Sequence, residues 1–142
     1  MHLGEIISVI ALFCGTVMGI GALFSPAWAS KVVRLVEDPD PLRPGGYSEF
    51  RATYGGVFLF AHLITALLVL YLWDGEHQLT TALVVLPLAA GWIGAAIGRT
   101  MSLILDTRKN REPGMIPVWI PTELILGLAI GAPFLQFLLQ TN

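Results

Sequence analysis

Four long stretches of the sequence contain no charged residue. Residues 6–30, 52–73, 77–98 and 124–142 lack Asp, Glu, Lys and Arg entirely. Each stretch is long enough to cross about 30 Å of hydrocarbon as a helix that rises about 1.5 Å per residue. The pattern therefore predicts an all-α fold, an integral membrane four-helix bundle in which residues 1–142 form a single transmembrane domain.

Helix-breaking residues refine the ends of these spans. Ser25 and Pro26 interrupt the first one, because serine favours the N-cap and proline the first helical position. We expect a short interfacial helix to follow, with apolar residues such as Trp28 toward the lipid. Pro, Gly and Asp crowd residues 37–46, which predicts a loop. The four spans are expected at about residues 5–24, 48–73, 79–106 and 121–139.

The basic residues predict the orientation in the membrane. Between the spans they fall in the first and third connections, and neither the chain ends nor the short turn at residues 74–76 contains Lys or Arg. Loops rich in Lys and Arg stay in the cytoplasm, so both termini are expected on the non-cytoplasmic side. The residues behind this prediction are Lys31, Arg34, Arg43, Arg108, Lys109 and Arg111.

The composition agrees with a membrane protein and excludes other classes. Of the 142 residues, 55% are hydrophobic and 13% are charged, whereas about a quarter of the residues of a soluble domain are charged. No basic surface is extensive enough for nucleic acid. The single Cys14 excludes an intrachain disulfide, and the three histidines are widely spaced, so no metal and no cofactor is expected.

Glycine pairs spaced four residues apart recur in three of the spans. This spacing clears side chains from one stripe of a helix, so that two helix backbones can approach each other. Close packing within one bundle and a homo-oligomer interface both fit the pattern. The glycines assigned to helix packing are Gly15, Gly19, Gly94, Gly98, Gly127 and Gly131, together with Gly55 and Gly56 at the start of the second span.

Polar residues gather at the predicted cytoplasmic ends of spans two, three and four. An antiparallel bundle could bring them into one charged cluster near headgroup depth, where a buried charge needs an opposite partner. Three interpretations stay open, namely a structural ion-pair network, independent snorkelling of long side chains, and a site for a ligand or lipid headgroup. The candidate residues are Glu49, Arg51, Tyr54, Arg99, Ser102, Asp106 and Glu123.

One histidine, His62, falls near the middle of the second span. An imidazole at this depth could relay protons. The alternative is a neutral core side chain that is hydrogen-bonded. The second interpretation is favoured, because buried polar side chains in proteins are usually hydrogen-bonded parts of the core.

Several of these residues occur in a pattern that resembles a known family. The segment Ser48-Glu49-Phe50-Arg51-Ala52-Thr53-Tyr54-Gly55-Gly56, with Gly98-Arg99-Thr100-Met101-Ser102, Asp106 and Glu123, is similar to the bacterial four-span family catalogued as domain of unknown function 4345. The resemblance covers nearly the whole chain. It implies a four-helix protein of the bacterial inner (cytoplasmic) membrane with no assigned activity, and it marks these positions without giving them roles.

The sequence leaves two classes of function open. It contains no HExxH pair, no G-x-S-x-G elbow and no phosphate loop, so no catalytic residue is assigned and an enzyme is not favoured. The first class is an accessory or structural subunit of a larger membrane assembly or homo-oligomer. The alternative is a binder or transporter of a lipid or small anionic or amphipathic ligand, with the charged cluster as its site. The lipid bilayer, and in the second case an anionic lipid, are the expected partners.

Overall fold

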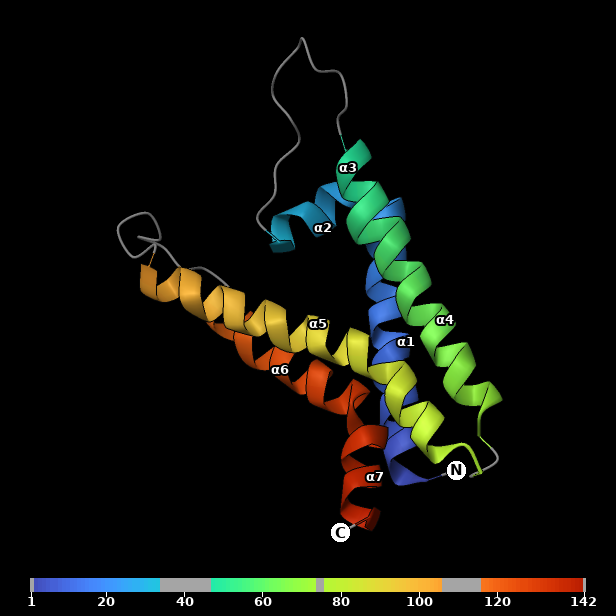
Figure 1. Ribbon diagram of the computed structural model, residues 1–142. Helices are drawn as coiled ribbons and strands as arrows, with labels where there is room; N and C mark the ends of the chain where they lie inside the picture. The colour runs from blue at the N-terminus through green and yellow to red at the C-terminus, as the bar shows by residue number, and fades with distance from the viewer. Residues whose placement is uncertain (1, 34–46, 74–75, 106–115, 142) are drawn as a thin grey trace. The chain divides into compact units, whose positions relative to one another are not determined.

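The computed structural model describes residues 2–33, 47–73, 76–105 and 116–141 (Figure 1). Within these ranges all regular structure is helical. The contacts divide the chain into two units. The α5 unit comprises Met1–Ala11 and Leu67–Asn142, and the π-helix unit comprises Leu12–Ala66.

Three helices are long and apolar enough to cross a membrane, namely α1 (Leu3–Phe24), the helical stretch Ser48–Tyr71 and α5 (Gln78–Leu105). A fourth candidate is the pair α6 (Ile116–Ile130) and α7 (Ala132–Thr141), which are bent by 53° at their junction. The all-helical class and the membrane-length apolar helices are thereby confirmed. The four-helix bundle stays a prediction. The remaining elements are α2 (Pro26–Val33), α3 (Ser48–Phe50), the π-helix η1 (Arg51–Val57) and α4 (Phe58–Tyr71).

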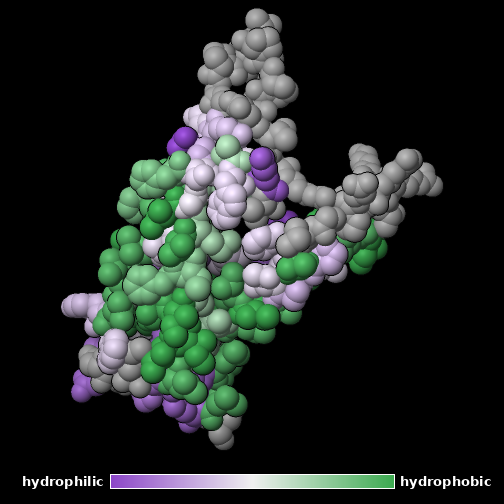
Figure 2. All heavy atoms as spheres, turned by 180° about the vertical axis from the view of Figure 1, so that it is seen from behind, coloured by the Kyte–Doolittle hydropathy of each residue, from purple (hydrophilic) through white to green (hydrophobic). Residues whose placement is uncertain are grey.

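Apolar side chains cover most of the face seen in Figure 2. Large exposed ones occur on every long helix, for example Val17 on α1, Phe60 on α4 and Ile125 on α6. A soluble monomer rarely exposes contiguous apolar surface on this scale, whereas a membrane protein presents it to lipid. The exposed apolar side chains therefore agree with helices that are long and apolar enough to cross a membrane.

The π-helix unit is held together by close approach of α1 to η1 and α4. A Cβ atom built on Gly19 would lie 2.6 Å from the Cα atom of Leu59, and one on Gly55 would lie 2.9 Å from the Cα atom of Leu23. Only glycine leaves room for backbones at this separation. Gly56 differs, because a Cβ there would meet nothing closer than 3.8 Å.

The short helix α2 begins at Pro26, directly after Ser25, as the sequence predicts. The Ser25 N–H donates to the Gly21 carbonyl and completes the last turn of α1, and the Ser25 carbonyl accepts from Trp28 N–H in the first turn of α2. The turn brings Ala29 of α2 into a small core with Ala22 and Phe50. Proline suits the first helical position, because a backbone N–H there would have no carbonyl partner within the helix.

In the α5 unit, α5 packs along α6 and α7. The contact with α6 is tightest at Gly127, where an added Cβ would lie 2.7 Å from Ile93 Cγ1 and 3.0 Å from the Ala89 carbonyl oxygen. Gly131 lies beside the same helix, 3.4 Å from the Ala89 Cβ by the same construction. These two glycines therefore let α6 approach α5 within one unit.

The last span differs in two ways from the expected helix at residues 121–139. It begins earlier, at Ile116, because Pro117 lies in the first turn, where a missing N–H is tolerated. It also breaks at Gly131, since Pro133 lacks the N–H that would continue the ladder. The Ile130 carbonyl accepts a buried hydrogen bond from Ser8 Oγ at 2.8 Å, which satisfies one group freed at the break.

Candidate functional site

A charged pair joins α5 to α6 inside the α5 unit. Arg99 Nε donates to Glu123 Oε1 at 2.6 Å. The Arg99 side chain is 27% exposed and that of Glu123 only 4%. Because a carboxylate at this depth needs a partner, the pair ties the two helices together at this point.

The pair leaves polar groups without partners. Glu123 Oε2 is buried and has no hydrogen bond, and neither has the buried indole N–H of Trp119, one turn earlier on α6. The terminal nitrogens of Arg99 form no hydrogen bond with any described residue, and the side chain is partly open. A guanidinium with unused N–H groups can hold a carboxylate or phosphate through parallel hydrogen bonds. The α5 unit therefore contains one basic group with spare capacity for an anion.

Two other predicted site residues lie nearby in the sequence. Ser102 is half-buried on the last turns of α5. Asp106 lies outside the described residues, so its expected place in the cluster stays a prediction. The Arg99–Glu123 pair joins two of the residues that the sequence predicts for a charged cluster.

The remaining predicted site residues belong to the π-helix unit. Arg51 donates through Nη1 to the Leu23 carbonyl at the end of α1, and Glu49 lies exposed in the first turn of α3. Tyr54 stacks on Phe50 with ring centroids 5.0 Å apart. Neither Glu49 nor Arg51 forms an ion pair with a described residue. Since these groups and the Arg99–Glu123 pair belong to different units, a single cluster of both stays a prediction.

The segment that resembles the four-span family adopts the π-helix. Residues Arg51–Val57 form η1, a wider turn than an α-helix, and the stretch contains Gly55 and Gly56. Such turns are rare and occur often at functional sites. Here the wide turn coincides with the place where Gly55 lets Leu23 approach.

His62 occupies a fully buried position in the π-helix unit. Its Nδ1 lies 2.6 Å from the Phe58 carbonyl oxygen, and its ring packs on the Phe58 ring with centroids 4.2 Å apart. A carbonyl oxygen only accepts, so Nδ1 carries the proton in this contact. Gly15 lies against the ring, where any side chain would collide with it. This geometry favours the core histidine over the proton relay.

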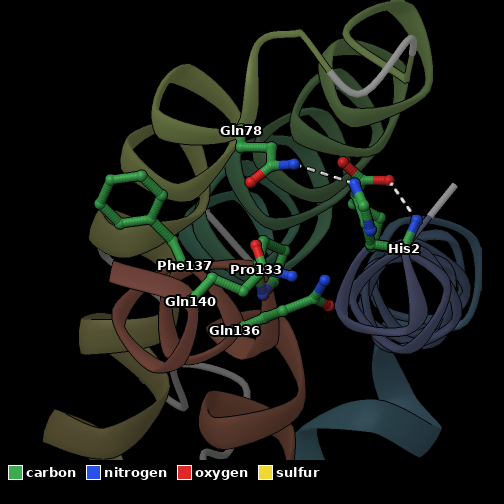
Figure 3. A pocket seen from close by; sticks show the side chains of 7 residues that line it. His2, Gln78, Pro133, Gln136, Phe137 and Gln140 are labelled. Carbon is green, nitrogen blue, oxygen red and sulfur yellow. Dashed lines mark hydrogen bonds between the residues drawn. The ribbon is translucent and has the colours of Figure 1, made fainter. Parts of the chain in front are cut away.

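The α5 unit also contains a polar pocket that the sequence does not predict (Figure 3). Its residues come from the start of α1, the start of α5 and from α7, and they are individually unremarkable in the sequence. The pocket is lined by three glutamines, a histidine and a buried carboxylate, together with a proline and an aromatic ring. The lining residues are His2, Glu5, Gln78, Pro133, Gln136, Phe137 and Gln140. The only sequence signal is the polar pair Gln136 and Gln140, one turn apart in an otherwise apolar span.

Within the part of the chain that the structure describes, no three His, Cys, Asp or Glu side chains come together as a metal site. Cys14 is exposed on α1. No protein-family model matches the chain, and no curated protein and no solved structure matches it either. The resemblance to the four-span family therefore stays a prediction.

Proposed function

We propose that the protein is a multi-span component of the bacterial inner membrane that serves as an accessory or structural subunit of a larger membrane assembly. Both termini would lie on the non-cytoplasmic side. Most of the basic residues that predict this orientation lie outside the described residues. No catalytic role is proposed.

One observation supports the proposal above the others, namely the open face of α5. Gly91, Gly94 and Gly98 are exposed, and a Cβ atom on any of them would meet no other atom of the α5 unit within 4 Å. At 3.6 residues per turn the three fall within about 60° of one another, opposite Ala89 and the α6 contact. We call these three glycines the open glycine face.

The open glycine face has an energetic cost that its own unit does not offset. Each glycine in a helix interior costs about 1 kcal/mol relative to alanine, so the three together cost about 3 kcal/mol. Inside a membrane, such a stripe is useful where another helix backbone packs against it. A partner helix from another subunit would supply that contact.

The experiment compares helix faces by substitution. Gly94→Leu and Gly98→Leu should each release a stoichiometric partner during purification in mild detergent, measured by native mass spectrometry. The melting temperature of the isolated chain should not fall, because leucine favours the helix more than glycine does. Leu128→Ala, on the exposed side of α6, is the control and should retain the partner. Parent protein that is monomeric in native membranes would refute the proposal. A lower melting temperature in both glycine variants would also refute it, because the open glycine face would then pack against another part of the same chain.

A second candidate function rests on the Arg99–Glu123 pair. The unused N–H groups of Arg99 and the unpartnered Trp119 N–H favour binding of an anionic lipid headgroup or a small anionic amphipathic ligand at this end of α5. Arg99→Gln should lose a co-purifying anionic lipid, whereas Lys31→Gln on the exposed side of α2 should keep it. Equal lipid content in the parent and in Arg99→Gln would exclude this site.

A further inference from the structure

The polar pocket of Figure 3 is lined by one buried carboxylate, that of Glu5, and by no Lys or Arg side chain. Glu5 is only 4% exposed. Its Oε2 accepts a hydrogen bond from the His2 backbone N–H at 2.9 Å, an arrangement that caps the start of α1. Its Oε1 has no hydrogen bond with a described residue, so capping uses only one of the two oxygens.

No basic side chain compensates this carboxylate in the described part of the α5 unit. Arg99 is the single Lys or Arg there, and it is bound to Glu123. Gln78 lines the pocket, and Arg99 lies 21 residues further along the same helix, roughly 32 Å at 1.5 Å per residue. The dipole of α1 favours a carboxylate in the first turn, and a cation bound in the pocket would add the positive charge that no Lys or Arg side chain supplies there.

His2 lies beside Gln78 in the pocket. Its Nε2 is 3.0 Å from Gln78 Nε2, as the dashed line in Figure 3 shows. With the Gln78 amide in this orientation its N–H donates to the imidazole nitrogen, and its Oε1 can accept from another group.

The three glutamines around the pocket each have an amide oxygen that can accept or bind a cation, beside an amide nitrogen that donates. Gln136 Oε1 already accepts from Gly4 N–H at 2.7 Å, which fixes its amide, and an amide oxygen has a second lone pair. Gln140 forms no hydrogen bond with a described residue and also lines the pocket. Carboxylate and amide oxygens are the ligands that hard cations prefer.

Size and charge limit the ligand. The cavity measures about 10 Å³, which is close to the space that one water molecule needs. A divalent ion would call for more negative charge than one carboxylate provides, since calcium sites usually combine several carboxylates in a shell of 6–8 oxygens. A monovalent cation of about the size of water matches both limits.

We propose that the pocket formed by Glu5, Gln78, Gln136 and Gln140 binds a water-sized monovalent cation, either an alkali-metal ion or ammonium. Glu5 Oε1 supplies the charge and the glutamine amide oxygens complete the shell. The site joins the first turn of α1 to α5 and α7, next to the break at Gly131. Broken helices host coupling ions in many membrane transporters. In the predicted topology the pocket faces the non-cytoplasmic side.

The test uses the full chain purified in mild detergent, melted in sodium, potassium, ammonium or choline chloride at equal ionic strength. Choline is too large for the cavity and serves as the reference. At about ten times its dissociation constant the bound cation should raise the melting temperature by about 4 °C over choline. The three small cations distinguish an alkali-metal site from an ammonium site. Identical melting in all four salts would overturn the proposal.

Variants locate the effect in the pocket. Glu5→Gln should abolish the cation-dependent rise, whereas Glu76→Gln, the same change at an exposed position before α5, should preserve it. Gln140→Leu should weaken the apparent affinity about tenfold without changing melting in choline, so it tests the site even if Glu5→Gln fails to fold. A cation-dependent rise that persists at parental concentrations in Glu5→Gln or in Gln140→Leu would refute the assignment.

Discussion

The two faces of α5 carry the same kind of small residue in opposite surroundings. On one face Ala89 and Ala96 are buried, and Ile93 meets Gly127 of α6 so closely that an added Cβ would lie 2.7 Å away. The opposite side of α5 is the open glycine face, where an added Cβ atom would have no atom of the α5 unit within 4 Å. The Gly94 and Gly98 pair and the Gly127 and Gly131 pair have identical spacing. Spacing alone therefore identifies a helix suited to close contact but not what it contacts.

The contrast assigns different roles to the two faces. The face toward α6 stabilises the α5 unit itself, through packing at Gly127 and through the Arg99–Glu123 pair. The opposite face adds nothing within the unit, so substitutions there should change association rather than folding. The expected packing of Gly94 and Gly98 inside one bundle does not hold within this unit, because their Cβ positions point into open space.

The largest effect is expected for Gly127→Leu. The new side chain would overlap Ile93 and the Ala89 backbone, so α6 would have to move away from α5. We expect the free energy of unfolding to fall by about 3 kcal/mol, measured by thermal melting in detergent. Gly98→Leu is the control with the same added volume on the open face. Equal destabilisation by both variants would contradict the contrast between the two faces.

A smaller effect is expected when the ion pair between α5 and α6 is broken. Arg99→Ala leaves Glu123 buried without a charge partner, at a cost of about 2 kcal/mol, which is below the value for a fully buried pair because Arg99 is 27% exposed. Glu123→Gln should cost less, since a neutral amide tolerates burial better. The double variant should lose less stability than the sum of the two single variants. Strict additivity would show that the two side chains act independently, as snorkelling predicts.

The smallest effect is expected for Gly91→Ala. On the open face a methyl group meets nothing in the unit, and alanine favours the helix, so the isolated chain should gain up to about 1 kcal/mol. Gly19→Ala in the π-helix unit is the contrasting variant. Its Cβ would collide with the Leu59 backbone, so its melting temperature should be lower than that of the parent. If Gly91→Ala also melted earlier, another part of the chain would be covering the open glycine face.

Much of the helical architecture follows from local sequence signals. The uncharged stretches predict the apolar helices, and Ser25 with Pro26 predicts the start of α2. Local signals predict that the last span begins near Pro121. The helix instead starts at Ile116, with Pro117 in its first turn and Pro121 inside it, so Pro121 does not mark the helix start. The break at Gly131 depends on the combination of that glycine with Pro133 and a hydrogen bond from Ser8, more than a hundred residues away in the sequence.

The candidate sites divide in the same way. The Arg99–Glu123 pair was among the allowed partners because both residues fall at predicted helix ends on one membrane side. The pocket around Glu5 could not be predicted, because its residues are spread from His2 to Gln140 and become a site only when three helix segments meet. Sequence patterns report periodicity within one helix, whereas this pocket depends on the register between helices.

The central claim is that the open glycine face packs against another protein, and photo-cross-linking in native membranes tests it most directly. Met101 is 53% exposed and flanks that face, so photo-reactive methionine there would replace its side chain with little change in size. A photo-reactive leucine at Leu128, exposed on α6, is the control for lipid contact. The account predicts a discrete product heavier than the chain from position 101 and only lipid adducts from position 128. Lipid adducts alone from both positions would contradict it.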